Sequence, residues 1–417
     1  MAGLAESASA QLEREVSVGL RGDAAIVGYT ERRSERHYSG EPRFAIEQWA
    51  DLAAHALADA GIASHEVNGL VCSGDLRESS LFVPATIAEY CGWSVDFAER
   101  LDLGGASPVG MVWRAAAAIE LGLCDVVVCA TVGLPTPRPP EPEPVDPRVV
   151  WGASSNTFGS PQAEFEIPYG NVAQNCGFAM YAQRYHELFG WDERARAKIA
   201  VDQRRSACAN PDAVFFGQPI TIDDVLASRM IADPLRMLEI VMPCYGGAAV
   251  VVTSRERAAR TRHRPVFVTG CGEHLTHKTP TYAHDMAATP IGPAADRTFA
   301  MAGIGRDAID MVQLYDCYTI TALLTIEDSG FCAKGEGMAF INEHDLSFEG
   351  DFPCNTHGGQ LGFGQPGLSG GMSHVVEAVR QVQGRAEQRQ LRRHDAAYVS
   401  GTGGVMSEQT ALVLQGG

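Results

Sequence analysis

A glycine-rich stretch from Pro353 to His374 holds residues whose types and spacing suit chemistry. It leads into residues 375–384, where apolar residues at 375, 376, 379 and 382 predict a core-facing helix that ends at Gly384. A tight turn before a helix N-terminus presents backbone N–H groups to an anionic or polarised oxygen. The stretch is therefore a candidate oxyanion site, and a well-packed structural turn is the alternative.

A second small-residue turn, from Gly104 to Gly110, precedes a predicted helix over residues 111–121. Ser107 followed by proline is typical of a helix N-cap, and no histidine in the sequence is an obvious partner to activate its hydroxyl. Three histidines lie close together further along the chain, at positions 274, 277 and 284. Because no convincing carboxylate pattern accompanies them, they favour the rim of a pocket over a metal site.

Predicted strands and helices alternate around both turns. The strands cover residues 24–29, 67–74, 97–103, 125–131, 246–253, 266–269, 310–316, 396–400 and 410–414, and further helices cover 44–60, 82–90, 172–189, 192–208, 293–303 and 319–329. This alternation favours a buried, mostly parallel α/β sheet, in which active sites lie at the carboxyl ends of strands. The order turn, helix, strand occurs at 105–133 and again at 367–401. This repeat predicts a duplicated unit whose two turns meet near a common centre.

Seven prolines between Leu134 and Pro147 interrupt the alternation and begin an insertion that continues to about residue 230. The insertion is rich in aromatic side chains, so we expect it to cover a pocket that takes a bulky apolar group; a small separate core is the alternative. The expected organisation is an N-terminal extension (1–23), a first half (24–258) that contains the insertion (134–230), and a second half (259–417).

Composition excludes several classes of protein. A chain of 417 residues with 45% hydrophobic and 20% charged residues is typical of a globular enzyme, and its net charge of −18 argues against nucleic-acid and anionic membrane surfaces. The 11 cysteines form no CxxC pair, which suits a reducing cytosol. The sequence has no membrane-spanning run, signal peptide, Walker motif or dinucleotide motif, so we expect a cytoplasmic protein that neither hydrolyses nucleotides nor uses a dinucleotide cofactor.

Several motifs in the right order resemble the thiolase superfamily, especially sterol-carrier-type thiolases and thiolase-like aldolases that cleave steroid side chains. Asn355-Thr-His-Gly-Gly is similar to the family's Asn-x-x-Gly-Gly segment, and Tyr315-Asp-Cys-Tyr is similar to its His-Asp-Cys-Phe region. Residues 226–235 and 401–407 also match, and the resemblance covers about residues 24–415. It implies a thiolase fold, with duplicated βαβαβαββ halves in a layered αβαβα arrangement and an inserted loop domain.

The departures from that family concern its chemistry. The position of the thiolase nucleophilic cysteine falls on Gly105, give or take one residue, and the family's Gly-His-Pro has Gln365 in place of histidine. Tyr315 replaces the histidine of the His-Asp motif, and Ser400 lies at or near the position of the closing cysteine. Because these replacements are neutral near pH 7, Claisen cleavage through an acyl-thioenzyme is not expected.

The resemblance instead implies retro-aldol cleavage of a β-hydroxyacyl-CoA, which needs no covalent intermediate. Tyr315 becomes the candidate acid/base, although its pKa of about 10 would have to be lowered by neighbouring donors or positive charge. The remaining candidates are oxyanion donors from Gly358 and Gly359 with His357 or Gln365, and from Gly105 opposite. Asp316 is expected to orient backbone, Asn355 and Ser400 to support the site, and Ser107 to be a possible substrate contact.

Two other functions stay open at this point. The chain could be an acyltransferase or thiolase that uses an atypical nucleophile, such as Cys317 or Ser107, or a non-catalytic subunit that binds acyl-CoA or lipid. The resemblance implies a coenzyme A thioester as substrate and no permanently bound cofactor. It also implies a homodimer formed through the central sheet and a separate small zinc-ribbon/OB-fold subunit.

Overall fold

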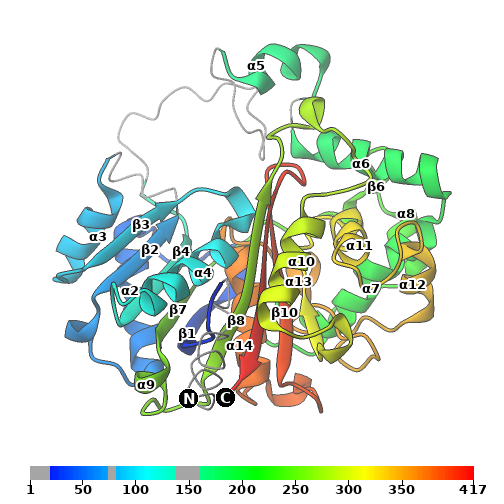
Figure 1. Cartoon of the computed structure of the whole chain (residues 1–417). Coiled ribbons are helices and arrows are strands. Elements are labelled where there is room, and N and C mark those ends of the chain that lie inside the picture. Colours follow the sequence, from blue (N-terminus) through cyan, green and yellow to red (C-terminus); the bar gives the residue numbers. More distant parts are fainter. Residues whose placement is uncertain (1–18, 74–80, 138–158, 172) are drawn as a thin grey trace, which may run out of the picture.

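The centre of the molecule is a mixed nine-stranded sheet in the order β3-β2-β4-β7-β1-β8-β11-β10-β9 (Figure 1). This computed structural model describes residues 19–73, 81–137, 159–171 and 173–417, so predictions on residues 1–18, 74–80, 138–158 and 172 lie outside it. Pairs β2–β3, β2–β4 and β9–β10 are parallel, and the pairs from β4 to β10 along the order are antiparallel. The strands are β1 (Ala24–Glu35), β2 (Gly69–Ser73), β3 (Phe97–Leu101), β4 (Val126–Gly133), β7 (Tyr245–Ser254), β8 (Val266–Leu275), β9 (Met311–Gln313), β10 (Ala396–Gly403) and β11 (Glu408–Gly416).

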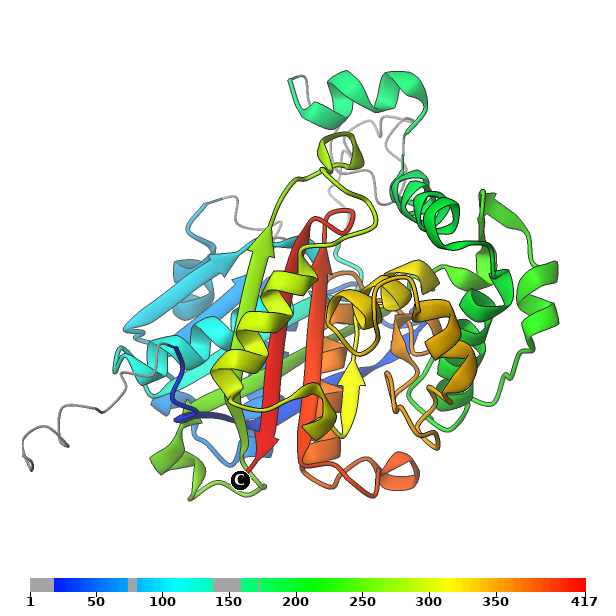
Figure 2. The same ribbon diagram turned by 45° about the vertical axis from the view of Figure 1, so that its right-hand side comes forward.

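Helices cover both outer faces of the sheet and fill the space between its two halves (Figures 1 and 2). α2 and α3 pack on the half formed by the N-terminal strands, and α10 and α11 pack on the other half. α4 and α14 contact strands of both halves. This is the layered αβαβα arrangement that the resemblance implies. The helices named here are α2 (Ala45–Ala60), α3 (Val83–Cys91), α4 (Ser107–Glu120), α10 (Ile291–Ala302), α11 (Thr319–Asp328) and α14 (Ser369–Val382), and the short ones are α9 (Arg255–Ala258), α12 (Gly337–Glu343) and α13 (Gly359–Gly362).

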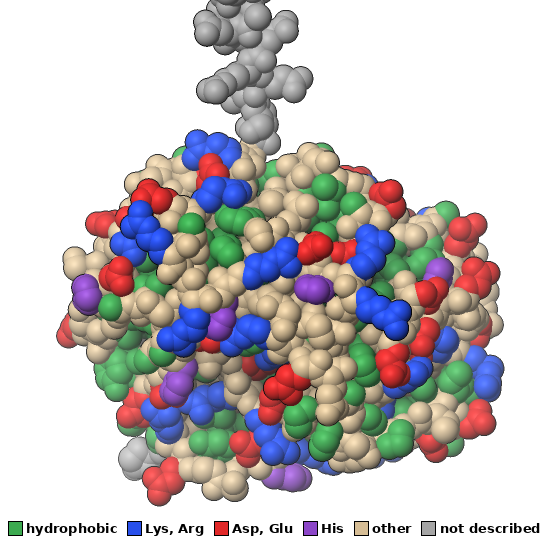
Figure 3. All heavy atoms as spheres, turned by 90° about the horizontal axis from the view of Figure 1, so that it is seen from below, with side chains coloured by type: hydrophobic (Ala, Val, Ile, Leu, Met, Phe, Trp, Pro, Cys, Tyr) green, Lys and Arg blue, Asp and Glu red, His purple; other side chains and the backbone are tan. Residues whose placement is uncertain are grey.

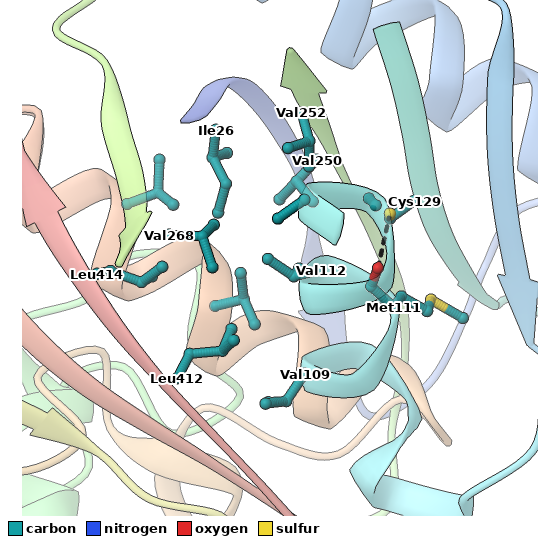
Figure 4. Close-up of a cluster of buried hydrophobic side chains, with 14 of the residues drawn as sticks. Ile26, Val109, Met111, Val112, Cys129, Val250, Val252, Val268, Leu412 and Leu414 are labelled. Carbon is teal, nitrogen blue, oxygen red and sulfur yellow. Dashed lines mark hydrogen bonds between the residues drawn. The ribbon is translucent and has the colours of Figure 1, made fainter. Parts of the chain in front are cut away.

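The inner layer is held by apolar side chains that α4 sends to both halves of the sheet (Figure 4). Burial of this interdigitated surface is the main favourable contribution to folding. Figure 4 labels Val109, Met111 and Val112 on the helix, and around them the strand residues Ile26, Cys129, Val250, Val252, Val268, Leu412 and Leu414.

The two central helices begin earlier than predicted. α4 begins at Ser107 instead of residue 111, and α14 begins at Ser369 instead of residue 375. Their first turns consist largely of small residues, which carry no apolar periodicity but permit close backbone contact. A Cβ at Gly371 would lie 2.6 Å from the Gly105 carbonyl oxygen. The two turns therefore meet at the centre of the molecule, as the internal repeat predicted.

The described part of the insertion forms a helical layer beside α11. The layer comprises α6 (Gln174–Phe189), α7 (Glu193–Cys208), α8 (Ile222–Ala227) and the hairpin β5 (Met230–Ala232) to β6 (Leu235–Arg236), whereas α5 (Pro161–Phe165) lies apart from it at the top of the molecule in Figure 1. α7 is capped by Asp192, whose Oδ1 accepts hydrogen bonds from the backbone of Arg194 and Ala195. The aromatic residues of α6 pack into the core against α11, whereas Phe165 and Tyr169 are exposed.

Basic and acidic side chains are interspersed on the lower face of the molecule, and Figure 3 shows no large surface of one sign there. A nucleic-acid surface would need clustered basic side chains. Among the described residues, no helix combines the length and the apolar composition that a membrane crossing requires.

Candidate active site

Tyr315 follows the end of β9 by two positions, and side chains from two other segments hold its backbone. The Asn355 amide pairs with both backbone groups of Leu314: Oδ1 accepts from the N–H at 2.7 Å, and Nδ2 donates to the carbonyl at 2.9 Å. The Ser400 hydroxyl oxygen in β10 accepts from the Tyr315 N–H at 3.2 Å. Because the Asn355 side chain occupies the groups that a ladder would use, the predicted strand over 310–316 is limited to Met311–Gln313.

The Tyr315 side chain extends into the contact between the two small-residue turns. A Cβ at Gly105 would overlap the Tyr315 hydroxyl and its ring carbon Cζ, and would lie 2.5 Å from the Thr402 carbonyl oxygen. Real Cβ atoms do not approach other atoms this closely. The phenol therefore fills the space that a side chain at position 105 would need.

Gln365 binds the same hydroxyl. Its Nε2 donates a hydrogen bond to the Tyr315 oxygen at 2.9 Å. The Gln365 backbone is fixed on both sides, because its N–H donates to Met242 O at 2.9 Å and its carbonyl accepts from Cys244 N at 3.1 Å. Gln365 therefore occupies the position of the histidine in the family's Gly-His-Pro motif. It contacts Tyr315, which occupies the position of the histidine in the family's His-Asp motif.

Burial raises the pKa of Tyr315 well above its usual value of 10, and the nearby Cys317 adds to that rise. Hydrogen bonds from Gln365 and Gln360 oppose the rise without reversing it. The sequence-based expectation required a lowered pKa. The structure shows the opposite, so Tyr315 is a neutral phenol at physiological pH.

Asp316 is fully buried behind the tyrosine and orients the backbone of α13. Its carboxylate accepts hydrogen bonds from Gln360 N at 2.8 Å and from Leu361 N at 3.2 Å. His374 Nε2 in α14 lies 3.2 Å from Oδ1 of the same carboxylate. Asp316 thus ties the segment after β9 to both helices of the glycine-rich stretch.

The oxyanion donors expected from the glycine turn are partly engaged. The Gly358 N–H donates to the Asn355 carbonyl at 2.8 Å, which closes the turn. No acceptor for the Gly359 N–H is found among the described residues. The imidazole of His357 is fully buried without a hydrogen-bond partner on either nitrogen, and burial with the neighbouring His374 lowers its pKa well below 6.5. The His357 ring packs against Phe363 and His374, with centroids 5.1 Å away in each case.

Ser107 and Cys317 are both poorly placed as nucleophiles. The Ser107 Oγ is buried and accepts a hydrogen bond from Leu103 N at 2.8 Å, so it closes the preceding turn and is not the N-cap of its own helix. Cys317 is buried beside Thr321 Oγ1 at 3.7 Å, and desolvation raises the pKa of its thiol well above 9. A neutral, buried thiol reacts slowly, because the thiolate is the nucleophile.

Sequence reasoning missed two residues of this site. His374 was named only as the last residue of the glycine-rich stretch, yet its ring lies 6.2 Å from the Tyr315 ring and its Nε2 lies 3.3 Å from Gln360 Nε2. Gln360 received no role at all. Both residues lie in the glycine-rich stretch that was already the candidate site. Their position there could have identified them as polar residues near Tyr315.

A cavity of about 300 Å³ opens beside Gly104, next to the Gly105–Tyr315 contact. The insertion contributes to its wall, as predicted, but with mostly polar residues and not with its aromatic ones. These residues are Gln162, Glu166, Asn171, Ala173, Gln174 and Gly177. The histidine-containing segment contributes Lys278 and Thr279 to the wall, as expected for a loop at a pocket rim, but none of its three histidines is among the lining residues.

Comparisons with known proteins agree with the fold. Residues 272–416 match the family "Thiolase C-terminal domain-like". A steroid side-chain-cleaving aldolase of Thermomonospora curvata is 32% identical over 376 residues, covering 88% of this chain and 91% of that protein. The 17-hydroxy-3-oxo-4-pregnene-20-carboxyl-CoA lyase of Mycobacterium tuberculosis is 33% identical over 371 residues, covering 88% and 92%.

Solved structures give the same result. The Ltp2-ChsH2(DUF35) aldolase aligns with a TM-score of 0.83 at 30% identity, over 95% of this chain and 98% of that one. Human mitochondrial 3-ketoacyl-CoA thiolase aligns with a TM-score of 0.65 at 14% identity, over 94% of this chain and 98% of that one, a likeness of fold alone.

Proposed function

This chain belongs to the thiolase superfamily and to its acyl-CoA carbon–carbon lyases, and from that premise we propose that it performs retro-aldol cleavage with Tyr315 as its proton-transfer group. The observation that carries the proposal is the contact between the Tyr315 hydroxyl and Gly105. The resemblance assigns the thiolase nucleophile to that point, and here a phenol fills it. No thiol stands at that point to form a covalent acyl intermediate.

One neutral phenol can perform both proton transfers of the reaction. The Tyr315 hydroxyl gives its proton to the α-carbon of the thioester while the bond between the α- and β-carbons breaks. The same oxygen takes the proton of the β-hydroxyl, which becomes a carbonyl. The transferring atoms form a six-membered ring (Cα, H, O, H, O, Cβ), so no free phenolate is needed. This route suits a phenol whose pKa is raised by burial.

The residues around Tyr315 would keep its oxygen in place for both transfers. Gln365 Nε2 donates to that oxygen at 2.9 Å, which stabilises negative charge that develops there. For the thioester oxygen, we propose the Gly359 N–H and the backbone at Gly105 as donors. His357 and Gly358 contribute to the fold of the turn, and Asp316, Asn355 and Ser400 hold the segments that carry Tyr315 and Gln360.

The substrate class follows from the same chemistry: a coenzyme A thioester with a hydroxyl on its β-carbon. A suitable test compound is 17-hydroxy-3-oxo-4-pregnene-20-carboxyl-CoA, the substrate in the name of a relative. Cleavage between its carbons 17 and 20 yields a 17-ketone and propanoyl-CoA. The reaction is redox-neutral and needs no resident cofactor.

Tyr315→Phe tests the assignment. Loss of the proton-transferring hydroxyl should lower kcat by roughly 100-fold or more. Tyr398→Phe is the matched control, because Tyr398 is also fully buried and, among the described residues, its hydroxyl bonds to Ser329 Oγ alone, at 2.9 Å, away from the site. Equal turnover by Tyr315→Phe and the control, measured as ketone released, would remove Tyr315 from the mechanism.

We propose two partners for the chain. β3 is the edge of the sheet and bonds only to β2 among the described strands, so its outer groups can continue the sheet into a second copy. A small zinc-ribbon/OB-fold subunit is the second partner, supported by the similar aldolase, whose name includes a DUF35 component. Size-exclusion chromatography coupled to light scattering, alone and with the co-purifying subunit, tests both. The cytoplasmic location stays a prediction.

A further inference from the structure

The 300 Å³ cavity begins one residue from the proposed reaction centre. Gly104 forms part of its wall, and the next residue, Gly105, contacts the Tyr315 hydroxyl. The opposite walls come from α6, from the loop after β8 and from the turn between β10 and β11, and Figure 1 shows these elements at the upper end of the sheet. A substrate whose β-carbon lies at Tyr315 can therefore extend into this cavity.

Part of the wall is apolar and tightly packed. A Cβ at Gly177 in α6 would lie 2.9 Å from Val405 Cγ1 and 3.2 Å from Pro280 Cγ. The helix thus touches both the β10–β11 turn and the loop after β8. Ala173 and Val405 add apolar surface on which a hydrocarbon skeleton can pack.

The charged groups of the cavity argue against the coenzyme end of the substrate. Asp102, Glu166 and Glu408 face a single cation, Lys278, among the described lining residues. Burial raises the pKa of Glu408, and the negative charge of the neighbouring Asp102 adds to that rise. The phosphates of coenzyme A would be repelled here. The cavity therefore suits the other half of the substrate, which leaves as the carbonyl product.

Thr279 and Lys278 line the cavity and could donate hydrogen bonds to a ligand. Thr279 is 2% exposed, and its hydroxyl finds no hydrogen-bond partner among the described residues. A buried hydroxyl without a partner is unusual, and a ligand oxygen would satisfy it. The adjacent Lys278 is exposed at the cavity edge. Glu166, by contrast, already accepts hydrogen bonds from Thr281 Oγ1 at 2.7 Å and Asn171 Nδ2 at 2.9 Å.

We propose that this cavity binds the carbonyl half of the substrate, and that Thr279 and Lys278 donate hydrogen bonds to an oxygen at its remote end. The ligand class is a carbocyclic skeleton with a keto or hydroxyl group far from the cleaved bond. Recognition of that oxygen makes Thr279 and Lys278 specificity-determining residues. Because the inference rests on the proposed function, its test combines turnover with a binding measurement that needs no turnover.

The kinetic test compares the oxygenated test compound with its counterpart that lacks the oxygen at carbon 3. Thr279→Val removes the hydroxyl and keeps the side-chain shape. It should lower kcat/KM for the oxygenated compound roughly three- to tenfold, the range for one neutral hydrogen bond, and leave the other compound unchanged. Lys278→Met should act in the same direction.

Thr325→Val is the matched control, because Thr325 is also fully buried with an unpartnered hydroxyl but lies in α11, outside the cavity lining. The control should keep the discrimination of the wild type. An equal loss for both compounds in Thr279→Val, or no loss for either, would overturn the proposal.

Calorimetric titration with the two 17-ketones separates this inference from the proposed function. The wild type should bind the ketone that carries the oxygen at carbon 3 more tightly, and Thr279→Val should abolish that difference. Absence of turnover with both acyl-CoA compounds would refute the lyase function. The ketone titration would still show whether the cavity binds the carbonyl half of the substrate. Equal affinity of the wild type for both ketones would refute the binding site.

Discussion

Replacing Gly105 with alanine would put a methyl group where the Tyr315 hydroxyl now lies. The new Cβ would overlap the hydroxyl and Cζ and would lie 2.5 Å from the rigid Thr402 carbonyl, so either the phenol or the turn must move. Overpacking of this kind costs about 1–3 kcal/mol of folding free energy. Because displacement of a reacting group by about 1 Å can cost roughly 100-fold in rate, we also expect a fall in kcat of that order.

The assay is chemical denaturation together with ketone release, and Gly110→Ala, in the helix α4 that follows the turn, is the control. A Cβ at Gly110 would meet Leu101 Cδ2 at 2.8 Å and Leu103 Cδ1 at 3.2 Å, the ends of flexible side chains that can move. In the Gly105→Ala background, Tyr315→Phe should add little further loss of activity, because both changes remove the same group from the site. Wild-type stability and kcat in Gly105→Ala would refute the placement of the phenol.

Three further predictions concern groups around the site. Cys317→Ala should retain kcat within about twofold, since a thiol kept protonated by burial is no nucleophile, and acyl labelling of Cys317 detected by mass spectrometry would contradict this. Glu377→Gln should lower the free energy of unfolding by about 3–5 kcal/mol, because the fully buried Glu377 carboxylate pairs with Arg380 and Arg389. The exposed Glu256–Arg260 pair provides a control: Glu256→Gln should lower the free energy of unfolding by less than about 1 kcal/mol. Burial lowers the pKa of His357 below 6.5, so at pH values under 6.5 His357 is protonated in the unfolded chain but stays neutral in the folded one. The free energy of unfolding is therefore highest above pH 6.5 and falls below it by up to about 1.4 kcal/mol per pH unit. His357→Leu should remove that share of the slope, and an unchanged slope in denaturation measured from pH 7.5 to 5.5 would contradict it.

Apolar periodicity predicted the long elements well and failed where small or polar residues set the boundaries. The helix expected over 44–60 is α2, Ala45–Ala60, and the one expected over 192–208 is α7, Glu193–Cys208. Both central helices were predicted to begin too late, because glycine and serine in their first turns carry no periodic signal. β9 ends early because a side chain from another segment, Asn355, binds the backbone of Leu314.

The sequence, through its resemblance to the thiolase superfamily, was enough to predict the thiolase fold, the absence of the family's nucleophile and histidine at the matching positions, and Tyr315 as the candidate proton-transfer residue. These follow from residue types in a fixed order along the chain. Only the tertiary structure decided that the phenol fills the space beside Gly105, that burial keeps it neutral, and that polar residues line the neighbouring cavity. Distance and burial depend on segments more than 200 residues apart that meet in the folded molecule, and no local pattern encodes them.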